Sequence, residues 1–213
     1  MGTELVTLEG EHVRLEPLER RHAAALVEAS AADTSLYQWS LVPVGQAAVD
    51  KYIDTALAWR DAGTALPFVT VRKSDGKVIG STRFFELERW PWPEGSAHRS
   101  QHEFDTGEIG YTWLTASAIR TAANTEAKLL MLTHAFETWK MCSVHFCTDE
   151  RNERSANAIL RTGAKLEGTL RAHRMAADFT PRNTKRFSIV ASEWHEVKRK
   201  LAKKLHPDSD IAS

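Results

Sequence analysis

The chain has 213 residues, of which 42% are hydrophobic and 26% charged, and its formal net charge at pH 7 is +0. This length allows one well-cored domain and leaves little for a second. A balanced charge provides no overall field that would attract nucleic acid or an anionic membrane. No apolar run approaches the roughly 20 residues that cross a bilayer, and the N-terminus lacks a signal-peptide pattern. We therefore expect a cytoplasmic protein without nucleic-acid or membrane partners.

The first half of the chain predicts a strand, two helices and a hairpin. Residues 13–15 alternate as a short strand, and apolar residues recur at helical spacing over 18–29 and 49–57. Two further strands, residues 68–71 and 78–87, flank an Asp-Gly pair, which is a strong local signal for a hairpin turn.

An irregular segment, residues 88–106, follows the hairpin. It contains Pro91, Pro93 and Gly95 together with Trp90 and Trp92. A connection of this length in a compact domain is usually functional or disordered. The tryptophans favour a packed flap over a free linker.

Residues 107–139 predict a strand, a loop of small residues and a long buried helix. The loop, residues 118–124, has no bulky side chain where the helix must begin. The first-turn amides of a helix lack partners within it and lie at the positive end of its dipole. This arrangement predicts an anion site, above all for phosphates.

The second half predicts a strand at 143–148, a short helix at 152–162 ended by Gly163, strands at 164–174 and 185–191 with a turn at 181–183, and a terminal helix capped by Ser192. The lysines of that helix are interpreted as a solvated face. The two cysteines, Cys142 and Cys147, lie five apart in a strand, on opposite faces, so we expect no disulfide. No zinc pattern or histidine–carboxylate cluster is present, and we predict no metal.

This order of elements indicates a mixed sheet flanked by helices. We expect a single domain over residues 1–205 and a tail over 206–213.

Three segments resemble the GNAT N-acetyltransferases, and most closely their RimJ/RimL branch, which acetylates protein N-termini and small amines. They are residues 107–114 (GEIGYTWL), 120–130 (RTAANTEAKLL) and 148–171 (TDERNERSANAILRTGAKLEGTLR). The resemblance implies an α/β fold whose central, mostly antiparallel sheet of about seven strands splits in a V between the fourth and fifth strands. Two loop positions depart from the family pattern: Ile119 stands at its first place and Ala122 at its central glycine. An alanine is compatible with phosphate binding if its φ stays negative, as in the first turn of a helix.

The resemblance also implies acetyl-CoA as the acyl donor. Its pyrophosphate would lie on the loop and first helical turn, and its pantetheine arm along the split in the sheet. The residues implied in coenzyme binding are Trp113, Leu114, Arg120, Thr121, Ala122, Ala123, Asn124, Thr125, Asn152 and Ser155.

Acetyl transfer to an amine requires loss of a proton from the ammonium, a polarised thioester carbonyl and protonation of the leaving thiolate. Glu108 is the candidate general base, directly or through water, or an anchor for the ammonium; the alternative is a salt bridge, for example to an arginine of the flap. Strand alternation predicts that Ile109, Tyr111 and Trp113 face away from Glu108.

By resemblance Asn152 would hold the pantetheine arm and Ser155 would protonate the thiolate. The alternative is that both only cap the helix. Tyr111 is a rival acid, with a core position as its own alternative.

The acceptor would be a primary amine, either a small molecule or a protein or peptide N-terminus; the flap favours a small or short peptide-like amine. Its candidate contacts are Trp39, Arg83, Phe85, Trp90, Trp92 and Glu108. The alternative function is a non-catalytic acyl-CoA-binding or regulatory protein of the same fold. Two exposed-edge hairpins make a homodimer an open expectation.

Overall fold

The computed structural model describes residues 4–31, 33–100 and 103–207. Most of the expected tail, residues 208–213, and two residues of the flap, 101 and 102, lie outside these ranges. The strands are β1 (Leu8–Glu9), β2 (Val13–Pro17), β3 (Leu66–Arg72), β4 (Val78–Glu88), β5 (Thr106–Leu114), β6 (Ser143–Asp149), β7 (Lys165–Met175) and β8 (Pro181–Val190). The helices are α1 (Ala23–Ala31), α2 (Gln46–Asp61), α3 (Ala122–Thr133), α4 (Glu153–Thr162) and α5 (Trp194–Leu205).

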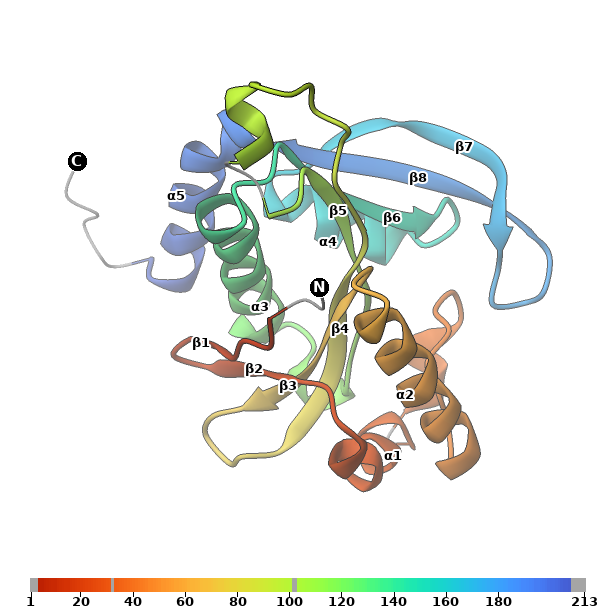
Figure 1. The fold of residues 1–213 in the computed structure, drawn as a ribbon. Helices are drawn as coiled ribbons and strands as arrows, with labels where there is room; N and C mark the ends of the chain where they lie inside the picture. The colour runs from red at the N-terminus through yellow and green to blue at the C-terminus, as the bar shows by residue number, and fades with distance from the viewer. Residues whose placement is uncertain (1–3, 32, 101–102, 208–213) are drawn as a thin grey trace.

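One eight-stranded sheet organises the chain, in the order β1-β2-β3-β4-β5-β6-β8-β7. Every neighbouring pair is antiparallel except β5 and β6, which run parallel. These two strands pair only over their first residues, Thr106–Glu108 with Ser143–His145, and then diverge (Figure 1). The mixed, mostly antiparallel α/β fold with a split between its fourth and fifth long strands is therefore confirmed. The additional strand is the two-residue β1, too short to leave a sequence signal.

Helices cover both faces of the sheet, and each side has its own apolar core. On one face α3 and α5 pack over residues that include Phe84 and Ile109. On the other face α1 and α2 pack over residues that include Val69 and Trp113 (Figure 1). Ile109 and Trp113 both lie on β5 but belong to different cores, so the strand does not alternate regularly.

The irregularity is a bulge at Tyr111. Its φ is +50°, and the pairing with β4 shifts between Arg83–Gly110 and Ser81–Trp113. A bulge adds one residue and reverses the direction of every later side chain. The expectation that Tyr111 and Trp113 face away from Glu108 is therefore wrong: both lie on its side of the sheet, where Tyr111 contacts Phe85.

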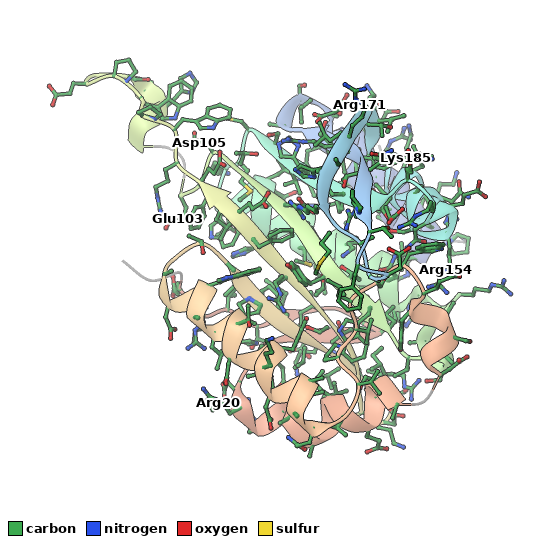
Figure 2. All side chains as sticks on the ribbon, turned by 90° about the vertical axis from the view of Figure 1, so that its right-hand side faces the viewer. Arg20, Glu103, Asp105, Arg154, Arg171 and Lys185 are labelled. Atoms are coloured by element: carbon green, nitrogen blue, oxygen red, sulfur yellow. The ribbon has the colours of Figure 1, made fainter. Side chains whose placement is uncertain are left out.

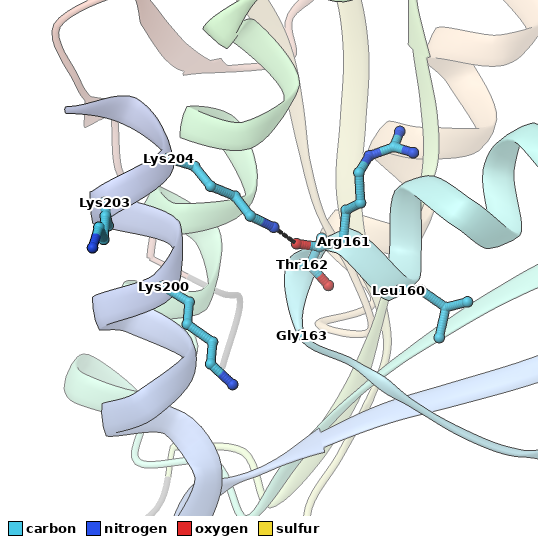
Figure 3. Close-up of a pocket in the computed structure, with 7 residues that line it drawn as sticks. All are labelled: Leu160, Arg161, Thr162, Gly163, Lys200, Lys203 and Lys204. Atoms are coloured by element: carbon cyan, nitrogen blue, oxygen red, sulfur yellow. Dashed lines mark hydrogen bonds between the residues drawn. The ribbon is translucent and has the colours of Figure 1, made fainter. Parts of the chain in front are cut away.

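The two ends of α4 match expectation. Asn152 is its N-cap, and Gly163 ends it with a φ of +101°. A cavity of about 380 Å³ separates this C-terminal end from α5, and Lys204 donates a hydrogen bond to the Arg161 carbonyl across it (Figure 3). A lysine there satisfies one of the free carbonyls at the helix end and complements its dipole.

The expected turn at 181–183 is wrong in position. These residues already belong to β8, and the chain reverses earlier, over 176–180, where the Phe179 amide donates to the Ala176 carbonyl. Both cysteines are free thiols. Across the described part of the chain, no helix combines the length and apolarity needed to cross a membrane.

Candidate active site

Glu108 lies on β5 just where β6 begins to leave it, and only 4% of its surface is exposed. Its Oε2 accepts a hydrogen bond from Arg174 Nη2 at 3.1 Å. The same nitrogen donates to Glu86 Oε1 at 2.7 Å. Burial raises the pKa of the Glu108 carboxyl, Arg174 opposes this rise, and Glu86 adds to it. The salt bridge considered as the alternative is real, but its arginine comes from β7 and not from the flap.

Two residues of the central strands lie beside Glu108. Phe85 on β4 is its cross-strand partner, and Gly110 lies two residues further along β5. A Cβ at Gly110 would come within 2.8 Å of the Phe85 ring and 3.4 Å of Glu108 Oε1. Glycine at position 110 thus leaves room for the aromatic ring beside the carboxylate.

Tyr111 belongs to this site and not to the core. It is 37% exposed, and its ring packs edge-on against Phe85 at 5.1 Å and Trp59 at 5.6 Å, measured between centroids. Burial raises the pKa of its phenol, and the nearby Arg83 and Arg174 oppose that rise. A raised pKa keeps the phenol protonated but makes it a weaker acid, so the rival-acid hypothesis for Tyr111 rests on its position beside Phe85 and not on this shift.

Arg83 lies beneath Tyr111 and is buried, with 1% of its surface exposed. Its guanidinium carbon is 4.5 Å from the centre of the Tyr52 ring, 5.5 Å from that of Trp59 and 4.3 Å from that of Tyr111. We call these three rings and the guanidinium the Arg83 cage. Among the described residues, neither its Nε nor its Nη2 has a hydrogen-bond partner.

The predicted anion loop leads into α3, and Thr121 caps the N-terminus of this helix. Thr121 is the N-cap of α3: its Oγ1 accepts from the Ala123 amide at 3.2 Å and donates to the Ala118 carbonyl at 2.8 Å. Ala122 is the first residue of the helix, and its φ is not positive. This is the condition under which an alanine at this place is compatible with phosphate binding. The left-handed residue is instead Arg120, with a φ of +62° and an exposed side chain. Small residues, free amides and an arginine fit a diphosphate at this place.

Asn152 and Ser155 lie at the other side of the split. Asn152 is 7% exposed, and its Oδ1 accepts from the Ser155 amide at 3.0 Å, so the capping interpretation of Asn152 is correct. The cap uses the side-chain oxygen of Asn152 and not its amide nitrogen. A cavity of about 290 Å³ adjoins Asn152, lined also by Ser35, Gln38, Trp39, Arg151, Glu153 and Arg154.

Trp39 is therefore placed beside the helix cap and not beside Glu108. Its ring lies 4.1 Å under the guanidinium carbon of Arg151. The same loop brings Tyr37 to the split, where its hydroxyl donates to the Leu114 carbonyl at 3.2 Å and its ring packs edge-on to Trp113. The backbone carbonyl of Leu114, which is expected to bind pantetheine, thus already has the Tyr37 hydroxyl as a partner.

The flap packs on itself and on Asp105. The Trp90 amide and the Trp92 indole nitrogen each donate to an Asp105 oxygen at 2.7 Å, and the two rings lie 5.6 Å apart. Figure 2 shows Asp105 at the base of this projecting segment, across the view from Arg171 and Lys185 of the β7–β8 hairpin. Among the described residues, the ring contacts of Trp90 and Trp92 stay within the flap, and none joins these tryptophans to Arg83, Phe85 or Glu108.

Sequence reasoning missed the residues from distant elements that lie around Glu108 and Arg83. Arg174 comes from β7, and Tyr52 and Trp59 come from α2. Their spacing in the chain carries no signal for this meeting. Within the described residues, no group of three or more His, Cys, Asp or Glu side chains converges as metal ligands would.

A sheet that parts between two parallel strands, beside a helix with an open N-terminus, is the architecture expected of acetyltransferases. The family description "Acetyltransferase (GNAT) domain" matches residues 12–165. The chain belongs to this family, which supports acyl-CoA-dependent N-acetyltransferase activity in general.

Solved structures agree. A GCN5-related N-acetyltransferase from Brucella melitensis is 25% identical, with a TM-score of 0.80 over 98% of this chain and 89% of that one. RimJ from Mycobacterium smegmatis, in complex with CoA-disulfide, shares the fold at 21% identity, with a TM-score of 0.74 over 94% and 92% of the two chains. RimL, a ribosomal L7/L12 alpha-N-protein acetyltransferase, shares the fold at 15% identity, with a TM-score of 0.71 over 88% and 96%. None of the proteins with curated functions matches this sequence significantly.

Proposed function

We propose that this protein transfers an acetyl group from acetyl-CoA to a primary amine, by direct attack of the amine within a ternary complex. The observation that carries the proposal is the buried carboxylate of Glu108, with its raised pKa, at the point where β5 and β6 separate. A carboxylate with a raised pKa is a better proton acceptor for an ammonium than an ordinary surface glutamate.

Glu108 takes the ammonium proton directly or through one water, or anchors the ammonium. Arg174 favours the ionised carboxylate and orients it through its 3.1 Å hydrogen bond. The uncharged amine is then free to attack.

Acetyl-CoA, when bound, supplies an activated thioester carbonyl. The residues suited to hold it are those of the loop and first turn of α3, from Arg120 to Thr125, with the backbone of Trp113 and Leu114 and the side chain of Asn152. Ser155, half-buried in the first turn of α4, is the proposed proton donor to the leaving sulfur, and Tyr111 is its rival. For Leu114 to bind the pantetheine arm through its carbonyl, Tyr37 must share or give up its hydrogen bond.

The proposed acceptor is a small molecule or the N-terminus of a protein or peptide. The RimL name supports the second class, whereas the closely packed aromatic residues beside Glu108 support the first. A cytoplasmic location belongs to the proposal and is supported by the two free thiols. A homodimer is proposed through the exposed outer strand β7, and sedimentation measurements would show it.

The alternative is a non-catalytic acyl-CoA-binding or regulatory protein. The departures at Ile119 and Ala122 are the features that favour it. Acetyl-CoA binding should be measured by calorimetry, and release of the coenzyme thiol with a panel of amino acids, small amines and peptides. Amine-dependent thiol release supports the enzyme, whereas binding without release across the whole panel favours the alternative.

A further inference from the structure

The guanidinium of Arg83 is the most deeply buried arginine group of the candidate site, and its surroundings do not neutralise it. Its cage consists of aromatic rings, and no carboxylate forms an ion pair with it among the described residues. Cation–π contacts stabilise the charge but leave the N–H groups unpaired. A buried N–H of a charged group is costly to leave without an acceptor.

The two unpartnered atoms are a specific pair. Nε and Nη2 point along the same edge of the guanidinium and together form the fork that binds both oxygens of a carboxylate. Among the described residues, two other arginines use that edge in this way: Arg72 on Asp75 and Arg151 on Asp149. In both of those pairs the arginine side chain is partly exposed, whereas the Arg83 fork is enclosed.

Arg83 lies on the same face of the sheet as Glu108. Arg83 and Phe85 are two residues apart on β4, and they pair with Gly110 and Glu108 on β5. Residues two apart on a strand point to the same face, roughly 7 Å from each other. Tyr111 contacts Phe85, lies over Arg83 and reaches solvent. A cationic fork and an anionic base therefore lie on one face, a short distance apart.

We propose that the acceptor is an amino acid-like compound that carries both an amine and a carboxylate, and that the Nε–Nη2 edge of Arg83 binds this carboxylate. This inference rests on the proposed function and narrows its acceptor. The carboxylate enters beside Tyr111, the partly exposed ring of the cage, and the amine lies toward Glu108. A peptide N-terminus has an amide at the corresponding position, which cannot form the charged bidentate pair.

The first test needs no variant. Initial rates should be measured with saturating acetyl-CoA for L-amino acids and their amides, for example phenylalanine against phenylalaninamide and leucine against leucinamide. We expect at least one pair to favour the carboxylate by about 100-fold or more in kcat/KM, because a site built around a buried fork rejects an analogue that leaves it unpaired. Equal rates for both members of every reactive pair, or a preference for the amides, would overturn the inference.

The second test uses Arg83→Gln, with Arg60→Lys as its matched control. Arg60 lies on α2 beside Trp59 and uses its Nε and Nη2 on Asp61, so its replacement leaves the cage intact. R83Q should remove the carboxylate preference mainly through KM, while R60K keeps it. Thermal unfolding shows whether R83Q is folded. An R83Q variant that is folded and keeps the full preference would contradict the assignment, as would one that loses only coenzyme affinity.

Calorimetry separates this inference from the proposed function. The affinity of each amino acid and its amide is measured for the protein saturated with coenzyme A. Selective binding of the carboxylate that R83Q abolishes, without turnover of any amine, would retain the Arg83 site and refute the enzyme. Turnover of amines without selectivity would retain the enzyme and refute the Arg83 site. Neither binding nor turnover of any amino acid would refute both.

Discussion

Arg174 Nη2 lies 3.1 Å from Glu108 Oε2 and 2.7 Å from Glu86 Oε1, so one guanidinium from the outer strand β7 joins two carboxylates from the central strands β4 and β5. Arg174 is the principal group that lowers the pKa of Glu108 against the effect of burial, and Glu86 acts in the opposite direction. A base must be deprotonated to act, so activity is lost as the pH falls through its pKa.

Arg174→Gln and Glu86→Gln should therefore shift the acidic limb of the kcat/KM profile in opposite directions. R174Q removes the opposing positive charge, raises the pKa of Glu108 and moves the limb to higher pH. E86Q removes a like charge and moves the limb to lower pH. The measurement is the pH dependence of thiol release, and limbs that coincide in all three proteins would show that Glu108 is not the titrating group.

Gly110→Ala should reduce activity more than stability alone explains. The new methyl group would come within 2.8 Å of the Phe85 ring, so the ring beside Glu108 must shift. Overpacking of this kind costs about 1–3 kcal/mol of unfolding free energy, and we expect roughly a tenfold loss in kcat/KM. Gly168→Ala on β7 is the control, because its Cβ would meet nothing within 4 Å. Equal kinetics in G110A and the wild type would contradict the tight arrangement around Glu108.

Ala122→Gly should not improve coenzyme binding, although it restores the residue that the family pattern has at this place. Ala122 is already helical with a φ that is not positive, so glycine adds only flexibility. We expect a loss of about 0.5–1 kcal/mol in stability and a change of less than about twofold in acetyl-CoA affinity. Ala47→Gly in the first turn of α2 provides the matched helical control. A tenfold gain in affinity, measured by calorimetry, would mean that Ala122 does limit phosphate binding.

Lys128→Met should stabilise the protein near neutral pH. The Lys128 ammonium is buried between Thr82 and Thr112, at 3.2 and 2.7 Å from their hydroxyls, and burial lowers its pKa to about 7. Between about pH 7 and the ordinary value of 10.5, the unfolded chain binds the proton more strongly, so wild-type stability rises with pH by up to about 1.4 kcal/mol per unit.

The methionine of K128M cannot bind a proton, so the stability of this variant should not rise with pH over this range. Urea unfolding of both proteins across this pH range gives the result directly, with Lys51→Met, at an exposed position of α2, as the control. If K128M is less stable than the wild type at pH 7, the hydrogen bonds to the two threonines outweigh the cost of burying the charge.

The order of the elements and the capped α4 could be predicted from the sequence, because each depends on local patterns. The split in the sheet was implied only by the resemblance to the GNAT acetyltransferases. The side of the sheet to which the β5 side chains point after Gly110 could not be predicted from the sequence. A tyrosine with a φ of +50° inside a strand leaves no mark in the hydrophobic pattern, and it moves Tyr111 and Trp113 to the other face.

The partners of Glu108 were also beyond sequence reasoning. Strand β8 inserts between β6 and β7, so Arg174 reaches the site from the outermost strand. Another left-handed residue, Ala172 with a φ of +47°, lies at the register shift just before it. Such long-range geometry depends on the whole sheet and not on any local spacing.

The most direct test of the central claim is amine-dependent release of the coenzyme thiol from acetyl-CoA by the wild type and by Glu108→Gln, which keeps the shape of the side chain and removes its charge. We predict steady turnover by the wild type and a loss of about 100-fold or more in kcat for E108Q, with acetyl-CoA affinity unchanged. Equal turnover by the two proteins, or binding of acetyl-CoA without thiol release by the wild type, would contradict the assignment of Glu108 as the catalytic base.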